Sequence, residues 1–185
     1  MLLFWIGVRE LTNRTLSISE VLRFANHDFL NQLQLIKMNL DLGRVEESKK
    51  LIEQISEQFK ANSNLNKLAL SKTVEWLQTV RWRFPAIEIE INSKVNSPVE
   101  EEVDELIADY LEKTIIHVYD HLDPFIEQHL LIEISTDKEY LQLIFELKGQ
   151  WDIESFQQPT LEKMAVETIA QTSNFWKYVL TFEQE

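Results

Sequence analysis

Residues 17–68 read SISEVLRFANHDFLNQLQLIKMNLDLGRVEESKKLIEQISEQFKANSNLNKL, and the pattern of this stretch decides the fold. Apolar residues in its first part recur three or four positions apart, which is the spacing of one face of an α-helix. These residues are Leu22, Phe29, Leu33, Ile36 and Leu40. Gly43 then stands where a helix would end in a left-handed turn. The stretch therefore predicts a helix over residues 17–42 that stops at this glycine.

A second helical run extends from residue 45 to residue 68 and has an apolar seam of its own. This seam consists of Leu51, Ile52, Ile55, Phe59, Leu65 and Leu68. Two long helices joined by so short a turn predict an antiparallel hairpin, in which each seam is covered by only one partner helix. We therefore expect two hairpins to pair as a homodimer with a four-helix bundle. The alternative is that the rest of the chain covers the exposed strip.

The rest of the chain alternates between helical and strand-like segments. We expect helices over 69–84, 97–122 and 160–170, and strands over 87–91, 130–136, 140–148 and 175–183. Ser97, Pro98 and Glu100 occupy the cap, first and third positions of a helix start. This order of elements predicts an α+β fold, with a hairpin domain over 1–68 and a C-terminal α/β domain over 69–185.

The composition excludes several classes of function. The formal net charge is −13, and residues 69–185 contain nine basic and 23 acidic side chains, so this half would repel nucleic acid, anionic lipid and polyphosphates. The three glycines lie far apart, which excludes the glycine-rich loops that bind nucleotide phosphates. The chain contains no cysteine and therefore has neither disulfides nor thiolate metal sites.

The apolar segment at residues 1–8 is far shorter than the roughly 20 residues of a membrane span, and it lacks the features of a signal peptide. We therefore expect a cytoplasmic protein that binds no membrane. No role for residues 1–11 follows from the sequence. His117 and His121 have the spacing of two metal ligands on a helix, but no third ligand accompanies them, so we expect no metal site.

His27 is the residue that points to chemistry. At about 100° per residue, it lies on the side of its helix away from the seam and so faces solvent. A neutral imidazole can attack phosphorus through one ring nitrogen. A nearby carboxylate, here Asp28, can orient the ring or take a proton, and an amide, here Asn31, can donate to phosphoryl oxygens. From spacing alone, an ordinary surface histidine is the simpler interpretation.

The helix face around His27 is uncharged and carries several large side chains. Its other members are Phe24, Asn31, Gln34, Leu35 and Met38. Three large apolar groups around one imidazole are typical of a surface that docks another protein.

Residues 27–40, HDFLNQLQLIKMNL, contain the pattern H-D-x-x-N-x-L-Q-x-I. This run resembles the corresponding helix of the sporulation initiation phosphotransferases, which are phosphorelay proteins. It is also similar to the dimerisation helices of sensor histidine kinases of the citrate and fumarate type. The resemblance is closest over residues 20–55 and extends in outline to the whole chain, whose second domain would be kinase-like without a nucleotide site.

The resemblance implies that His27 is the phosphorylated nucleophile and that Asp28 and Asn31 support it. The surface on which a response regulator would dock consists of Phe24, Gln34, Leu35 and Met38. The histidine would accept a phosphoryl group from the aspartate of one regulator and pass it to the receiver of a second regulator, which controls sporulation initiation. The chain would have no cofactor of its own, because the receiver supplies the Mg²⁺.

Two other functions compete with this phosphotransferase. An ATP-dependent histidine kinase would need an Asn-bearing helix and glycine-rich lid motifs, yet residues 106–122 contain no Asn and residues 69–185 contain one glycine, Gly149. A non-catalytic dimeric scaffold would keep the bundle and bind a response regulator without needing His27. Labelling from a phosphorylated receiver or from ATP separates the three.

Overall fold

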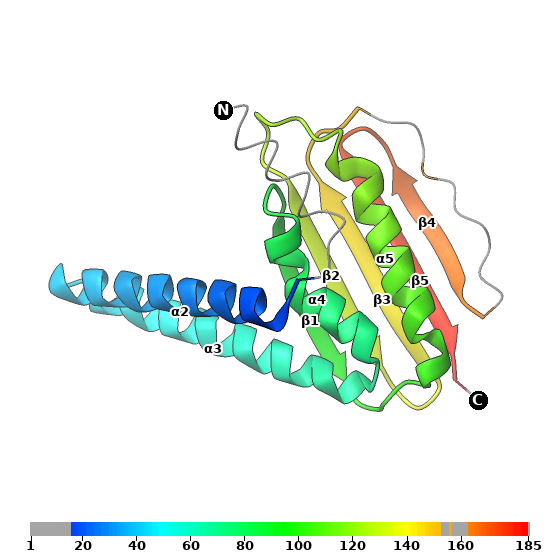
Figure 1. Cartoon of the computed structure of the whole chain (residues 1–185), viewed down its shortest axis with the longest axis horizontal. Coiled ribbons are helices and arrows are strands. Elements are labelled where there is room, and N and C mark those ends of the chain that lie inside the picture. Colours follow the sequence, from blue (N-terminus) through cyan, green and yellow to red (C-terminus); the bar gives the residue numbers. More distant parts are fainter. Residues whose placement is uncertain (1–15, 153–155, 157–162, 185) are drawn as a thin grey trace.

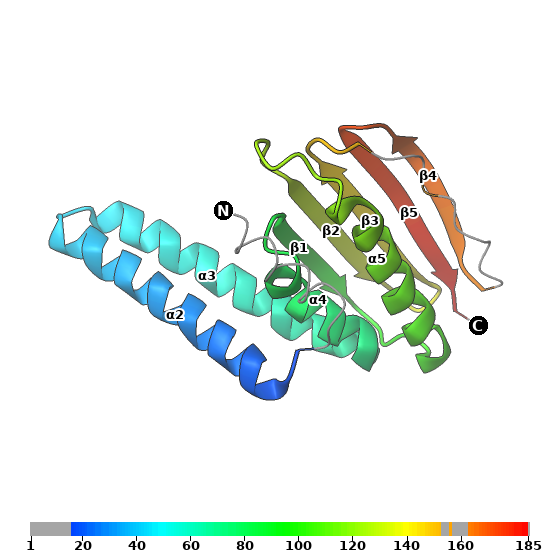
Figure 2. The same ribbon diagram turned by 45° about the horizontal axis from the view of Figure 1, so that its top comes forward.

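The computed structural model describes residues 16–152, 156 and 163–184, so residues 1–11 lie outside the described part of the chain. A long helical hairpin extends away from a sheet that is covered by helices (Figures 1 and 2). Helices α2 (Ile18–Asp41) and α3 (Val45–Leu65) form this hairpin. The predicted fold class, a helical N-terminal region followed by an α+β domain, is confirmed.

The ends of the hairpin helices follow from local chemistry. Ser17 caps α2: its hydroxyl accepts a hydrogen bond from the N–H of Glu20 at 3.3 Å, and the Glu20 carboxylate accepts one from the N–H of Ser17 at 2.9 Å. Gly43 has a φ of 73°, the left-handed conformation that the sequence predicts for the turn. The turn is therefore short enough to fold α3 back along α2.

The sheet has five strands in the order β1-β2-β3-β5-β4. These are β1 (Glu88–Val95), β2 (His129–Thr136), β3 (Tyr140–Lys148), β4 (Ala165–Gln171) and β5 (Phe175–Glu183). Strand β1 is parallel to β2, and the other neighbouring pairs are antiparallel. Helices α4 (Ser71–Arg83) and α5 (Asp104–Tyr119) pack side by side on one face (Figure 1).

The hydrophobic core lies between this sheet face and the two helices. In β2, β3 and β5, every second side chain is buried, as in Leu143, Phe145 and Leu147 of β3. The core continues into the end of the hairpin, because Leu65 and Leu68 are also fully buried in it. Leu68 lies in a 3₁₀ turn, η1 (Asn66–Leu68), that follows α3. The domain boundary at residue 68 stays a prediction.

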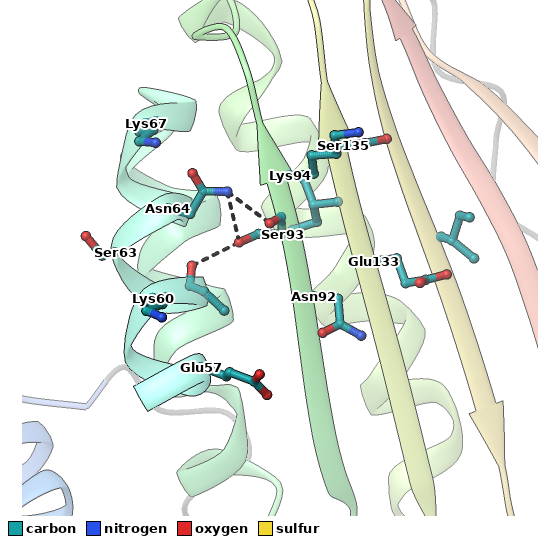
Figure 3. A pocket seen from close by; sticks show the side chains of 13 residues that line it. Glu57, Lys60, Ser63, Asn64, Lys67, Asn92, Ser93, Lys94, Glu133 and Ser135 are labelled. Carbon is teal, nitrogen blue, oxygen red and sulfur yellow. Dashed lines mark hydrogen bonds between the residues drawn. The ribbon is translucent and has the colours of Figure 1, made fainter. Parts of the chain in front are cut away.

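Side-chain hydrogen bonds attach α3 to the edge strand β1. The Asn64 amide donates to the backbone oxygen of Ser93 at 2.9 Å, and the Ser93 hydroxyl donates to the backbone oxygen of Ala61 at 2.9 Å (Figure 3). A hollow of about 770 Å³ lies beside this contact and contains none of the predicted site residues. The contact fixes the hairpin of α2 and α3, called the rod below, to one edge of the sheet.

The prediction of a helix starting at Ser97 is wrong. A 3₁₀ turn, η2 (Glu101–Val103), precedes α5, which begins at Asp104. The Ser97 hydroxyl donates instead to the backbone oxygen of Asp137, just after the end of the neighbouring strand β2. The Asp104 carboxylate accepts from the backbone N–H groups of Lys72 and Thr73, both at 2.8 Å, and so caps α4 rather than its own helix.

The prediction of a helix over 160–170 is also wrong where the structure describes it. Residues 165–171 form β4, which pairs with β5, and residues 160–162 lie outside the described part. The segment contains three β-branched residues, Val166, Thr168 and Ile169, and such residues favour the extended conformation of a strand. Its backbone pairs with β5 at the edge of the sheet.

Candidate functional site

The side chain of His27 is 70% exposed on α2, as the helical spacing predicts. The two ring nitrogens of His27 differ in their contacts. Nδ1 lies 3.2 Å from Nδ2 of Asn31 and 3.5 Å from Oδ1 of Asp28, the second distance being at the outer limit of a hydrogen bond. Nε2 has no hydrogen-bond partner in the described part of the chain. The nitrogen available to a reaction partner is therefore Nε2.

The contacts at Nδ1 decide whether Nε2 is a nucleophile. A proton on Nδ1 can be donated to the Asp28 carboxylate, and this tautomer leaves the lone pair of Nε2 free. Without that proton, Nδ1 can accept from the Asn31 amide, and Nε2 then carries the proton. Asp28 and Asn31 thus favour opposite tautomers in the observed arrangement.

A residue that the sequence analysis did not single out also contacts Asp28. The indole Nε1 of Trp82, on α4, donates to Oδ2 of Asp28 at 2.8 Å. Arg81 lies nearby: burial lowers the pKa of its guanidinium, and the negative charge of Asp28 raises it in part. No local pattern indicates these contacts, because Trp82 is 54 positions from Asp28 along the chain.

Arg23 is a second residue that the sequence analysis missed, although it precedes His27 by four positions on the same helix. An open hollow of about 680 Å³ on α2 is lined by both residues together with Asn26 and Leu30. The Arg23 guanidinium carbon lies 5.2 Å from the centre of the Phe24 ring. The region around His27 therefore includes a positive charge, and it is less neutral than predicted.

Three of the four predicted docking residues lie on the exposed surface of α2: Gln34, Leu35 and Met38. Leu35 is 46% exposed and Met38 is 49% exposed. Phe24 differs, because its ring stacks on Trp82 with centroids 6.0 Å apart and is partly buried. Phe24 was predicted on the same outward face as His27, but its ring is partly covered because α4 approaches this end of the rod.

The apolar seam of the hairpin remains open in the single chain. No residue of α2 is buried, and Leu22, Phe29 and Leu33 are 57%, 46% and 46% exposed. A groove of about 600 Å³ runs between α2, α3 and α4 and is lined by Leu22, Phe29 and Phe59. In the described part of the chain, the C-terminal half therefore does not cover the seam.

The described residues contain neither a candidate metal cluster nor a helix that could span a membrane. No cluster of three or more His, Asp or Glu side chains there could hold a metal ion. The ring of His117 packs against the rings of Phe156 and Trp176, with centroid distances of 4.9 and 6.1 Å. Among the helices of residues 16–152, none has the length and hydropathy needed to cross a membrane.

The comparison with known families identifies the class of the hairpin. Residues 8–68 match the family described as Sensor_kinase_SpoOB-type, alpha-helical domain. The chain is 27% identical over 139 residues to Sporulation initiation phosphotransferase B of Bacillus subtilis (strain 168). The aligned region covers 74% of this chain and 71% of the relative. The resemblance predicted from residues 27–40 is thus confirmed.

Two solved structures have a similar arrangement at low sequence identity. The histidine kinase domain of the Erythrobacter litoralis EL346 blue-light activated histidine kinase is 9% identical, with a TM-score of 0.44 over 95% of this chain and 89% of that one. A bacterial phosphotransferase is 12% identical, with a TM-score of 0.38 over 90% of this chain and 98% of that one.

Proposed function

We propose that this chain is a phosphotransferase of two-component signalling that carries a phosphoryl group on His27. The observation that carries the proposal is the Nε2 atom of an imidazole that is 70% exposed and is held on its other side by Asp28 and Asn31. The relative named as a sporulation initiation phosphotransferase supports it. The proposal extends to a relay that controls sporulation initiation.

The transfer balances as a displacement at phosphorus. The lone pair of Nε2 attacks the phosphorus of an aspartyl phosphate on a response regulator. The N–P bond forms as the P–O bond breaks, and the regulator's carboxylate leaves with the electron pair. Positive charge develops on the imidazole, where the Nδ1 proton faces Asp28 at 3.5 Å. The reverse reaction with the aspartate of a second regulator releases the histidine.

The chain needs to supply only the nucleophile and a docking surface, because phosphoryl transfer depends mainly on positioning and charge neutralisation. We propose that the receiver supplies the Mg²⁺ and that this chain has no cofactor of its own. Gln34, Leu35 and Met38 lie along α2 from His27 and form the docking surface with Phe24 at its edge. Arg23 can offset part of the phosphoryl charge.

We further propose that the active species is a homodimer. The exposed seam leaves Phe29, Leu33 and Phe59 in water at 46%, 46% and 57% exposure. Such a strip is costly to leave uncovered, and a second hairpin would cover it with the same residues by two-fold symmetry. The resulting four-helix bundle would hold two His27 rings on its outside.

A labelling experiment tests the function. The protein is incubated with a receiver carrying ³²P on its aspartate, and acid-labile, base-stable label on the chain is measured. We expect label on the wild type and none on His27→Gln, with both forming dimers of the same mass. Label from ATP alone would indicate a kinase, and receiver binding without label would indicate a scaffold.

A further inference from the structure

Trp82 connects the C-terminal part of the chain to the carboxylate beside His27. Its indole N–H donates to Oδ2 of Asp28 at 2.8 Å. Its ring stacks on Phe24 with an interplanar angle of 21°, and Phe24 lies one helical turn before Asp28 on α2. The indole is therefore held by one contact while it holds the carboxylate by the other.

The second oxygen of the same carboxylate faces the histidine. Oδ1 of Asp28 is 3.5 Å from Nδ1 of His27, whereas Nδ2 of Asn31 is 3.2 Å from the same nitrogen. A carboxylate that turned away would leave Asn31 as the only neighbour of Nδ1, and the proton would then move to Nε2. The orientation of Asp28 thus determines whether Nε2 keeps its lone pair.

We propose that Trp82 is a positioning residue for phosphoryl transfer: by fixing the Asp28 carboxylate, it holds His27 in the tautomer whose Nε2 can attack. The inference rests on the proposed role of His27. The partly buried Arg81 lines the same groove as Asp28 and adds a positive charge near its carboxylate, which supports the arrangement. Because both residues lie on α4, the C-terminal domain takes part in the site even though it offers no reacting group.

The substitution Trp82→Phe tests this role, since phenylalanine keeps a ring for Phe24 and lacks the N–H donor. The ¹⁵N shifts of the neutral His27 ring report which nitrogen carries the proton. We expect the Nδ1–H form to predominate in the wild type and the population to move towards Nε2–H in the variant. Transfer from a phosphorylated receiver should slow by roughly three- to tenfold, the range of one lost hydrogen bond.

Trp76→Phe is the matched control. Trp76 lies on the same helix, and its indole N–H donates to a carboxylate, Oε2 of Glu112, at 2.7 Å. This pair lies away from His27, so the substitution removes the same kind of bond without changing the site. We expect the His27 ring shifts and the transfer rate of Trp76→Phe to equal those of the wild type.

A double-mutant cycle separates action through Asp28 from a general effect on α4. Adding Trp82→Phe to Asp28→Asn should slow transfer no further, because Trp82 acts through the carboxylate. Additive losses, or unchanged His27 tautomers in Trp82→Phe, would overturn the proposal. A wild type that never carries phosphate would instead contradict the proposed function, and the tautomer measurement, which needs no phosphate, distinguishes the two failures.

Discussion

The helix that carries His27 and the helix that covers the sheet differ in how fully the single chain buries them. No residue of α2 is buried, whereas Ile107, Leu111 and Ile115 of α5 are completely buried. Both helices have an apolar face, so the difference lies in what each face meets. The core of the sheet domain is complete within the described residues, whereas no described residue covers the apolar surface of the rod.

The largest expected effect lies in the sheet domain. Leu111→Ala should lower the free energy of unfolding by about 3 kcal/mol, because it removes buried methyl groups and leaves a cavity. Urea denaturation followed by circular dichroism measures it. Leu30 of α2 is 56% exposed, so Leu30→Ala should change the free energy of unfolding by less than about 1 kcal/mol. Equal losses for the two variants would remove the contrast between the regions.

The next effect concerns the rod. Leu33→Asp should raise the dissociation constant of the homodimer by roughly a hundredfold or more, because a carboxylate would be buried in the four-helix seam. Sedimentation equilibrium gives the constant, and Leu33→Met serves as the control of similar volume. The strand signal in the far-ultraviolet circular dichroism spectrum should remain, because the substitution does not touch the sheet. A wild type that is monomeric at all concentrations would contradict the dimer.

A smaller effect is expected where Asp104 caps α4. Burial alone would raise the pKa of its carboxyl group, but hydrogen bonds from Lys72, Thr73 and Ser71 outweigh it and lower the pKa. The folded pKa lies below the unfolded value, so this stabilisation is present above about pH 4 and is lost as the pH falls through the folded pKa. Asp104→Asn should lose about 1–2 kcal/mol at pH 7.

Acid titration of the same variant checks the sign of this effect. Stability measured by urea unfolding should fall less steeply between pH 5 and pH 2 in Asp104→Asn than in the wild type, with the unfolded pKa of about 3.9 as the upper end of the difference. Parallel pH profiles would show that the carboxylate is not linked to folding. This experiment concerns only the sheet domain and leaves the rod unaltered.

The smallest effect concerns the exposed face of α2. Leu35→Asp should weaken receiver docking about tenfold, because the new charge would be desolvated at the interface. Isothermal titration calorimetry with the receiver measures the affinity, and Ser63→Asp on α3 controls for the added negative charge. Transfer rates equal to wild type in Leu35→Asp would remove Leu35 from the docking surface.

Local periodicity was sufficient to predict the hairpin and the exposure of His27. Leu22, Phe29 and Leu33 repeat at helical spacing, and a glycine breaks the pattern at residue 43, so both signals lie within a few turns of each other. Strands β2, β3 and β5 were predicted for the same reason, because alternation is visible within a few residues. For these elements, neighbouring positions are therefore enough to predict the secondary structure.

The failures involve partners that are distant in sequence. Ser97 has the chemistry of a helix cap, but Asp137, at the end of the neighbouring strand β2, provides it with another acceptor. The local sequence of residues 165–170 predicts a helix, but in the structure these residues form hydrogen bonds with β5 as a strand. Such choices depend on which segments meet, and tertiary contacts override weak local preferences.

The sequence by itself determined that a helical hairpin carries an outward imidazole, because side-chain spacing along one helix depends on the backbone period alone. Only the tertiary structure decided that Trp82 would reach Asp28, and that Phe24 would turn partly inward, since both contacts require α4 to pack beside α2. The exposure of the proposed nucleophile, His27, is a local property of the chain. The orientation of its neighbouring carboxylate depends on a helix more than fifty residues away.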